Sequence, residues 1–238
     1  MLIRPSSDRK TRAYAAEKNT FGLLPGPDNS CPGATTEPGG CAHVPEGRKL
    51  PDCYVFKLMK CYGGVAKILQ HNSDLLMGSS YQVRYELFKA EFRRFLDEHL
   101  RRKRDHQPRY RIHWSGDCPD ETYARALRAA MDEFPQIKFW GYTRSWFSVA
   151  VMAGSPNCDW YLSLDEVNFA EGYAEFLKWE HDPAVSNISW AYMGKEKPVG
   201  SWTAQMASCP VDLGKMEVEG ACQKCQLCLA GSAIYFKS

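Results

Sequence analysis

The sequence predicts an α/β fold, a partial or complete (βα) barrel of about six mainly parallel strands with a cysteine-rich C-terminal segment. The first observation is that short β-branched or aromatic stretches alternate with stretches of helical period from residue 110 onward. The second is a concentration of cysteines over residues 209–228. A chain of 238 residues with 44% hydrophobic content is long enough for a sizeable core. We therefore expect a single barrel-like domain over residues 1–238.

The first elements are less regular. Residues 1–18 are polar and charged without a sustained apolar period, so we expect an irregular N-terminal arm there. A first strand is predicted over residues 20–24, before a breaker-rich stretch of prolines and glycines. A cysteine-rich loop then leads into a helix from residue 54, on which Cys61 is interpreted as a small buried hydrophobe.

A second helix is predicted after Ser79-Ser80, because aromatic residues recur there every three or four positions. Its C-terminal part carries a basic run within residues 93–104. Such a run is usually a solvated face, although a patch of this size also suits a host protein or a nucleic acid. The net charge of +2 argues against a protein directed as a whole to polyanions.

The regular part of the chain contributes the remaining strands, with helices between them. We expect strands at residues 110–114, 137–142, 159–164, 186–192 and 233–236. In parallel sheets and barrels the ligand site lies at the carboxyl ends of the strands. The residues expected to share that edge are Asp117, Thr143, Arg144, Asp165, Glu166 and Tyr192.

Three of these residues are the candidate catalytic groups. Asp117 and Asp165 offer carboxylates for proton transfer, and Arg144 offers a guanidinium that can clamp a carboxylate or phosphate. Structural roles compete with these assignments. Asp117 suits a cap for a helix beginning near Pro119, and Arg144 suits an ion pair with either carboxylate. His113, within a strand, is favoured as a core histidine over a ligand or a general base.

The cysteine-rich C-terminal segment carries the strongest chemical signal. Cys222, Cys225 and Cys228 have C-x2-C-x2-C spacing, which lets one tight turn aim three thiolates at a single centre while Cys209 supplies a fourth. We predict a [4Fe-4S] cluster on these four residues. Zinc is the alternative, but zinc sites usually take separated C-x2-C pairs. Disulfides are disfavoured because a framework of ten cysteines belongs to small secreted domains.

A second set of thiols lies in the loop after the first predicted strand. Cys31, Cys41 and Cys53 are second-tier metal ligands, because such long intervals need the fold to gather them. One cluster is therefore preferred over two. Both sets are expected to open onto the carboxyl ends of the strands, so that the cluster caps the barrel mouth.

Four separate motifs resemble the phage family catalogued as gene product eighty-eight, cysteine-rich proteins of actinobacterial phages. The matching residues are Cys31–Thr35 with Cys53-Tyr54, Arg111–Asp117, Tyr142–Ser145, and Cys209-Pro210 with Cys222, Cys225 and Cys228. The resemblance implies a viral protein and little about activity. The chain is also faintly similar to radical S-adenosylmethionine enzymes, TIM-barrel-like proteins with a C-x3-C-x2-C loop after the first strand. The intervals here are far longer, which argues against S-adenosylmethionine binding.

These observations favour an iron-sulfur protein with a binding or regulatory role during infection, because four thiolates leave no open iron for a substrate. The alternatives are a redox or radical-type enzyme acting at the barrel mouth and a zinc-stapled structural protein. The chain opens without an apolar signal region and holds no apolar run long enough to cross a bilayer. The expected location is therefore the host cell cytoplasm.

Overall fold

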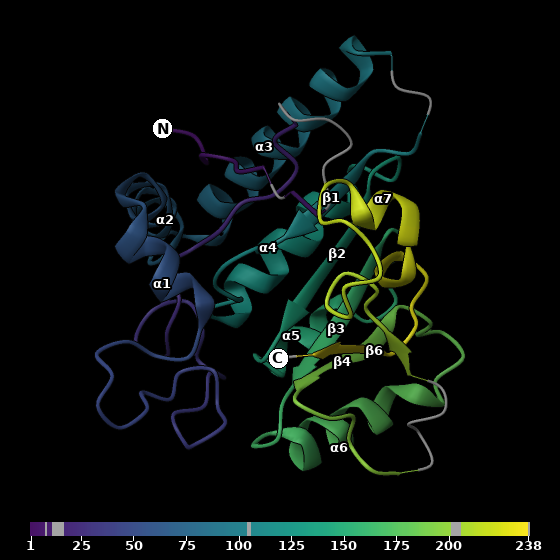
Figure 1. The fold of residues 1–238 in the computed structure, drawn as a ribbon. Coiled ribbons are helices and arrows are strands. Elements are labelled where there is room, and N and C mark those ends of the chain that lie inside the picture. The colour runs from purple at the N-terminus through teal and green to yellow at the C-terminus, as the bar shows by residue number, and fades with distance from the viewer. Residues whose placement is uncertain (8, 11–16, 104–105, 201–205, 238) are drawn as a thin grey trace.

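The structure is a computed structural model that describes residues 1–238 except positions 8, 11–16, 104–105, 201–205 and 238. Its described residues form a six-stranded sheet in the order β1-β2-β3-β4-β6-β5, with parallel pairing throughout. The strands are β1 (Arg109–Ile112), β2 (Lys138–Thr143), β3 (Cys158–Leu164), β4 (Ile188–Gly194), β5 (Ala207–Ser208) and β6 (Ile234–Lys237). The predicted α/β fold is confirmed, and the open edges at β1 and β5 make it a partial rather than a complete barrel (Figure 1).

The helices frame this sheet. They are α1 (Tyr54–Cys61), α2 (Gly63–Leu76), α3 (Tyr81–Arg101), α4 (Glu121–Asp132), α5 (Phe147–Met152), α6 (Phe169–Glu180) and α7 (Ala221–Cys225), followed by the 3-10 turn η2 (Leu227–Leu229). Ser80 caps α3 by accepting from the Val83 amide, as N-terminal serines commonly do. Asp120 caps α4 by accepting from the Tyr123 amide at 2.7 Å. The predicted capping role of Asp117 is therefore wrong.

Two expectations for the strands need correction, and one strand was not predicted. Residues 20–24 form no regular strand, although Thr20 makes a parallel bridge to Arg111 beside β1. The Trp114 amide also donates to the Phe21 carbonyl at 3.0 Å, so the segment extends the sheet edge without a continuous ladder. The last predicted strand, β6, does not close the sheet but lies between β4 and the short unpredicted β5.

The predicted irregular arm is anchored where it is described. Ile3 is buried, and the Arg4 amide donates to the Asn72 side chain at 2.8 Å. Ser6 makes an antiparallel bridge to Thr20. Positions 8 and 11–16 of the predicted arm lie outside the described residues.

One face of the sheet packs against α3 and α4 through an aromatic core. Phe92 on α3 lies 4.7 Å from Phe139 on β2, measured between ring centroids, and Trp160 on β3 is fully buried. Gly141 makes room for that indole, since a Cβ there would come within 2.3 Å of the Trp160 ring. Burial of large apolar side chains stabilises this face.

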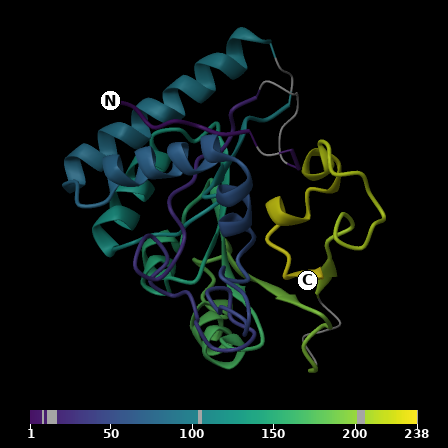
Figure 2. The ribbon, with the colours of Figure 1, turned by 60° about the vertical axis from the view of Figure 1, so that its left-hand side comes forward.

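The other face of the sheet carries the C-terminal segment. Tyr161, Ala191 and Ile234 form a small buried cluster on this face, and Leu227 and Cys228 pack against it. Figure 2 shows the yellow C-terminal segment on the side of the sheet away from α3. Among the described residues, the helices all fall short of the length and apolar character that crossing a bilayer requires.

Candidate metal centre

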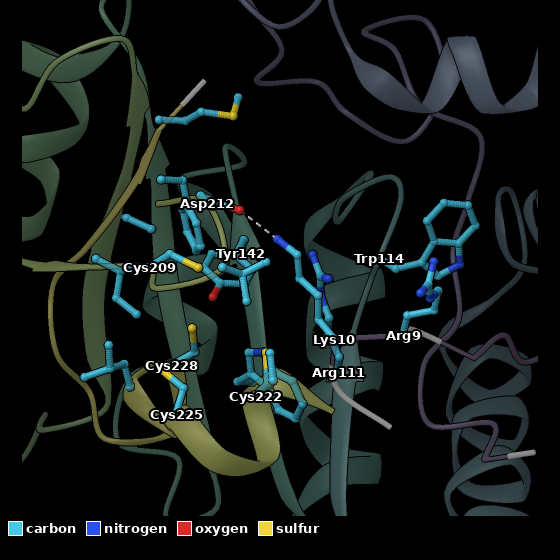
Figure 3. A pocket seen from close by; sticks show the side chains of 18 of the residues that line it. Arg9, Lys10, Arg111, Trp114, Tyr142, Cys209, Asp212, Cys222, Cys225 and Cys228 are labelled. Carbon is cyan, nitrogen blue, oxygen red and sulfur yellow. Dashed lines mark hydrogen bonds and ion pairs between the residues drawn. The ribbon is translucent and has the colours of Figure 1, made fainter. Parts of the chain in front are cut away.

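A cavity of about 810 Å³ lies between the second face of the sheet and the C-terminal segment. All four cysteines of the predicted cluster line it: Cys209, Cys222, Cys225 and Cys228. Figure 3 shows them on one side of the cavity and basic side chains across from them. The sheet contributes Trp140, Tyr142 and Phe236 to the same lining, which makes much of the wall aromatic.

The backbone explains how distant cysteines reach one cavity. Cys209 directly follows β5, and its amide donates to the Tyr235 carbonyl of β6 at 2.8 Å. Cys222 and Cys225 lie on α7. The chain then turns at Gln226, which adopts a left-handed φ of 58°, and η2 brings Cys228 back toward the sheet. The C-x2-C-x2-C spacing thus spans one short helix and one tight turn.

The N-terminal arm forms another wall of the cavity. The Cys222 amide donates to the Lys10 carbonyl at 2.8 Å, and the Gly220 amide donates to the Arg9 carbonyl at 2.9 Å. The Lys10 ammonium donates to the Asp212 carboxylate at 3.0 Å. Burial opposes the charge on Lys10, but Asp212 and the nearby Cys209 and Cys222 raise its pKa overall.

Basic side chains dominate the charge of the cavity. Four basic side chains line the cavity. Among the described lining residues, Asp212 contributes the one carboxylate. The guanidinium of Arg111 lies 5.6 Å from the centre of the Tyr142 ring. The basic residues of the lining are Arg9, Lys10, Arg111 and Lys237. Such a wall suits a ligand with net negative charge.

Burial favours the protonated form of two of the cavity thiols, those of Cys209 and Cys228. Burial raises the pKa of Cys228 to about 11, while a hydrogen bond with Tyr142 and the charge of Arg111 act in the opposite direction. Burial also raises the pKa of Cys209. Metal ligation by these residues therefore releases protons, as thiolate ligation generally does.

The spacing of the cavity cysteines differs from that of a tetrahedral zinc site. A tetrahedral zinc holds its thiolates about 3.8 Å apart, given Zn–S bonds near 2.3 Å. Within the described part of the chain, the groups of metal-ligand atoms within 4.8 Å of one another do not include these cysteines. A cubane takes wider sulfur spacing because each thiolate binds a different iron atom.

The predicted catalytic residues do come together at the carboxyl ends of β2 and β3. The Asp117 carboxylate accepts from the Arg144 amide at 2.6 Å and the Thr143 hydroxyl at 2.8 Å. The Arg144 guanidinium donates to Asp165 in a buried ion pair. Burial raises the pKa of Asp117 to about 6. These contacts use the polar atoms to hold neighbouring loops, and the ion pair matches the structural role predicted for Arg144.

The other strand-end residues differ from one another in their surroundings. His113 follows β1 with a left-handed φ of 51°, and its Nε2 lies 2.7 Å from the Tyr123 hydroxyl. Burial lowers its pKa to about 3, which matches the predicted core histidine. Tyr192 is buried in the helix-covered core, and Glu166 has an exposed side chain.

The N-terminal cysteines occupy a different place. Cys31, Cys41 and Cys53 do not line the cavity, and the Cys53 amide donates to the Cys41 carbonyl at 2.9 Å. Burial and the nearby Asp117 raise the pKa of Cys31 to about 12. The expectation that both sets share the barrel mouth is wrong, because the C-terminal set lies over the sheet face. Cys61 is exposed rather than buried, since it ends α1 at the surface.

The basic run at the end of α3 is partly neutralised by acids on the same helix. Arg94 donates to Glu91 at 2.7 Å and to Glu98 at 3.2 Å, and Arg102 donates to Glu98 at 3.1 Å. Arg104, the last predicted member, lies outside the described residues. The patch is therefore less basic than its sequence suggests.

Sequence reasoning did not single out the basic and aromatic wall of the cavity. Arg111 and Tyr142 alternate with buried core residues along β1 and β2, so they point to the second face. This alternation is the sequence signal that could have placed Arg111 and Tyr142 on the second face of the sheet. It does not show that a distant cysteine segment covers that face.

Comparisons with known proteins agree over nearly the whole chain. The family described as Gene product 88 matches residues 1–231. The Gene 88 protein of Mycobacterium phage L5 is 29% identical, covering 96% of this chain and 94% of its own length. The Gene 88 protein of Mycobacterium phage D29 is 28% identical with the same coverage. No solved structure matches the chain. With a match that spans strands β1 to β5 and both cysteine groups, the chain belongs to the Gene product 88 family of phage proteins.

Proposed function

We propose that this phage protein holds a [4Fe-4S] cluster on Cys209, Cys222, Cys225 and Cys228, and that the cluster supports a binding or regulatory role in the host cytoplasm. The observation that carries the proposal is that these four thiols line one cavity. Four cysteines are the usual complete ligand set of such a cluster.

The charge of the cavity supports this ligand. A cluster with four thiolates is an anion, and a buried anion needs compensating charge. Lys10 lies near Cys209 and Cys222, and Arg111 lies near Cys228. The aromatic wall formed by Trp140 and Tyr142 limits water at the site, which helps a cluster to persist.

A structural or redox role follows from the ligand count. When four thiolates occupy all four irons, no iron is open to a substrate. The carboxylates of Asp117 and Asp165 are engaged in hydrogen bonds and an ion pair. These contacts favour a structural role for both residues over proton transfer. The cluster would fix the C-terminal segment against the sheet and join it to the N-terminal arm.

A redox or radical-type enzyme is the second candidate, and the size of the cavity favours it. The cavity of about 810 Å³ reaches beyond the cysteines to Tyr54 on α1 and Trp114 after β1. This extra room could admit a small molecule beside the cluster. Such an enzyme would need an iron that is not ligated by cysteine.

Metal analysis of anaerobically purified protein tests the proposal. We expect about four irons and four acid-labile sulfides per chain, as one cubane requires. The electron paramagnetic resonance spectrum of the reduced protein should stay unchanged when S-adenosylmethionine is added. A perturbed spectrum would instead support the enzyme. Zinc without iron or sulfide would contradict both and leave a zinc-stapled protein.

A further inference from the structure

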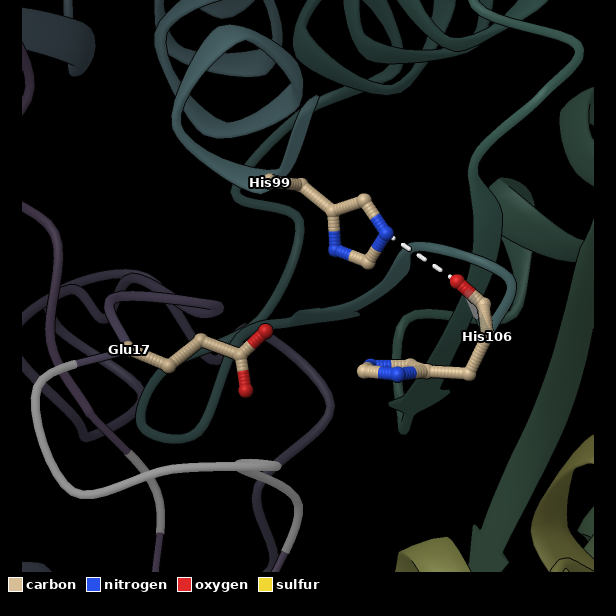
Figure 4. Close-up of side chains that lie close together, drawn as sticks. All are labelled: Glu17, His99 and His106. Carbon is tan, nitrogen blue, oxygen red and sulfur yellow. Dashed lines mark hydrogen bonds between the residues drawn. The ribbon is translucent and has the colours of Figure 1, made fainter. Parts of the chain in front are cut away.

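Three metal-ligating side chains converge at the far end of α3, outside the cysteine cavity. Glu17 comes from the N-terminal segment, His99 from the last turn of α3, and His106 from the connection to β1 (Figure 4). One ligand atom from each lies within 4.8 Å of the other two. Glu17 and His99 are each only 3% exposed, and His106 is half-buried.

The hydrogen bond of His99 determines which nitrogen can bind a metal. Its Nε2 lies 3.0 Å from the backbone carbonyl oxygen of His106. A carbonyl oxygen only accepts hydrogen bonds, so Nε2 carries the proton and donates it. In neutral His99 the lone pair is therefore on Nδ1, which faces the space between Glu17 and the His106 ring in Figure 4. Metal-binding histidines commonly use their second nitrogen in this way.

The two imidazole rings meet edge to face. The His99 and His106 rings are nearly perpendicular, at 85°, with centroids 5.1 Å apart. Two imidazoles and one carboxylate are a common ligand set for zinc, with a fourth position left to water.

A second group in the molecule brings metal-ligating side chains together within a buried hydrogen-bond network. His113, Asp117 and Cys118 also place ligand atoms within 4.8 Å of one another. The Asp117 oxygens accept from the Cys118, Arg144 and Ser145 amides, and Nε2 of His113 is hydrogen-bonded to a tyrosine. Those contacts describe a polar core rather than a metal site.

We propose that Glu17, His99 and His106 bind one Zn²⁺ ion. The ion would tie the N-terminal segment to the end of α3 and to the chain that enters β1. The same N-terminal segment supplies Lys10 to the cysteine cavity, so this staple would hold the arm at both ends. Glu17, His99 and His106 do not line the cysteine cavity, so the two sites share no ligand.

The test uses the full-length protein as purified anaerobically, with whatever metal its cysteines hold. Zn²⁺ is added, excess ion is removed by gel filtration, and bound zinc is counted. Zinc K-edge absorption then separates nitrogen and oxygen ligands near 2.0–2.1 Å from sulfur ligands near 2.3 Å. We expect about one zinc per chain with nitrogen and oxygen ligands.

Two variants and a matched control complete the test. Glu17→Gln and His106→Ala should each weaken zinc binding by at least about tenfold, the usual effect of disturbing a metal site. His181→Ala should bind zinc as the unmodified protein does, because the His181 side chain is 87% exposed and lies elsewhere. Unchanged far-ultraviolet circular dichroism would show that the variants fold. Absence of zinc, zinc ligated by sulfur alone, or zinc retained by both variants would overturn the proposal.

Discussion

The cysteines of the N-terminal loop and those of the C-terminal segment differ in their surroundings. Cys31 lies near the buried Asp117, which disfavours a thiolate. Cys228 lies near Arg111 and is hydrogen-bonded with Tyr142, both of which favour one. The first set belongs to a loop at the strand ends, whereas the second lines a cavity with a basic wall. The number of cysteines alone therefore does not identify a ligand set, because a thiolate cluster also needs space and compensating charge.

The largest expected effect is loss of the cluster when one cavity cysteine is removed. Cys225→Ala should abolish the brown chromophore and reduce soluble expression sharply, because a three-thiolate site exposes an iron and loosens the segment. The visible absorbance of the purified protein and the soluble fraction of expressed protein measure both effects. Cys61→Ala is the control, since Cys61 is exposed at the end of α1. A Cys225→Ala protein with full chromophore would refute the ligand assignment.

The pH dependence of stability tests the surroundings of Asp117, the buried carboxyl near Cys31. The folded-state pKa of Asp117 is about 6, against an ordinary value of 3.8. The folded protein therefore binds more protons than the unfolded chain between these values, and stability falls as the pH rises through 6. The loss is about 3 kcal/mol at most.

Urea unfolding at pH 4 and pH 7, compared between the unmodified protein and Asp117→Asn, measures that loss. The unmodified protein should lose more stability than the variant over this interval, because asparagine does not titrate there. An equal change in the free energy of unfolding between pH 4 and pH 7 for the two proteins would mean that Asp117 is already ionised at pH 4 in the folded state.

A third prediction separates packing from metal ligation in the N-terminal loop. A Cβ on Gly33 would come within 1.8 Å of the Arg144 carbonyl oxygen, so Gly33→Ala must displace the loop. We expect a loss of about 2 kcal/mol in the free energy of unfolding, with an unchanged iron content. Gly64→Ala on α2 meets nothing within 4 Å and should stabilise slightly. Equal stabilities for the two variants would contradict the close packing of the loop on Arg144.

The smallest predicted effect concerns the charge of the cavity wall. Arg111→Gln removes a cation near Cys228, so the more reduced, more negative cluster should become harder to form. We expect the reduction potential to fall by about 60 mV, which corresponds to a tenfold change for one electron. Arg111→Lys keeps the charge and should shift the potential less. A potential that stays constant in both variants would show that Arg111 does not compensate the cluster.

Much of the fold could be predicted from periodicity. The aromatic stripe of α3 predicts a helix that packs against the core. The strands β2, β3 and β4 are buried along almost their whole length, and such buried runs separated by helices are typical of a parallel sheet. The short β5 could not be predicted because Ala207-Ser208 has no pattern of its own and pairs only where β6 supplies a partner. Residues 20–24 have strand composition but follow the sheet edge with a single bridge.

The candidate site could be predicted only in part. The cysteine spacing predicts that three of the cavity thiols lie close together, because they must share one local turn. Arg111 and Lys10 were not identified, because their closeness to Cys228 and Cys222 depends on how the C-terminal segment crosses the sheet. Glu17 and His99 are also far apart along the chain. Contacts of this kind arise from tertiary packing and have no local sequence signal.

The most direct test of the central claim compares two triple variants purified anaerobically. One replaces Cys31, Cys41 and Cys53 with alanine, and the other replaces Cys222, Cys225 and Cys228. Iron and acid-labile sulfide per chain are then measured. We predict that the first variant keeps about four irons, as one cubane requires, and that the second keeps none. Loss of iron in the first variant with retention in the second would place the cluster in the N-terminal loop and contradict the assignment.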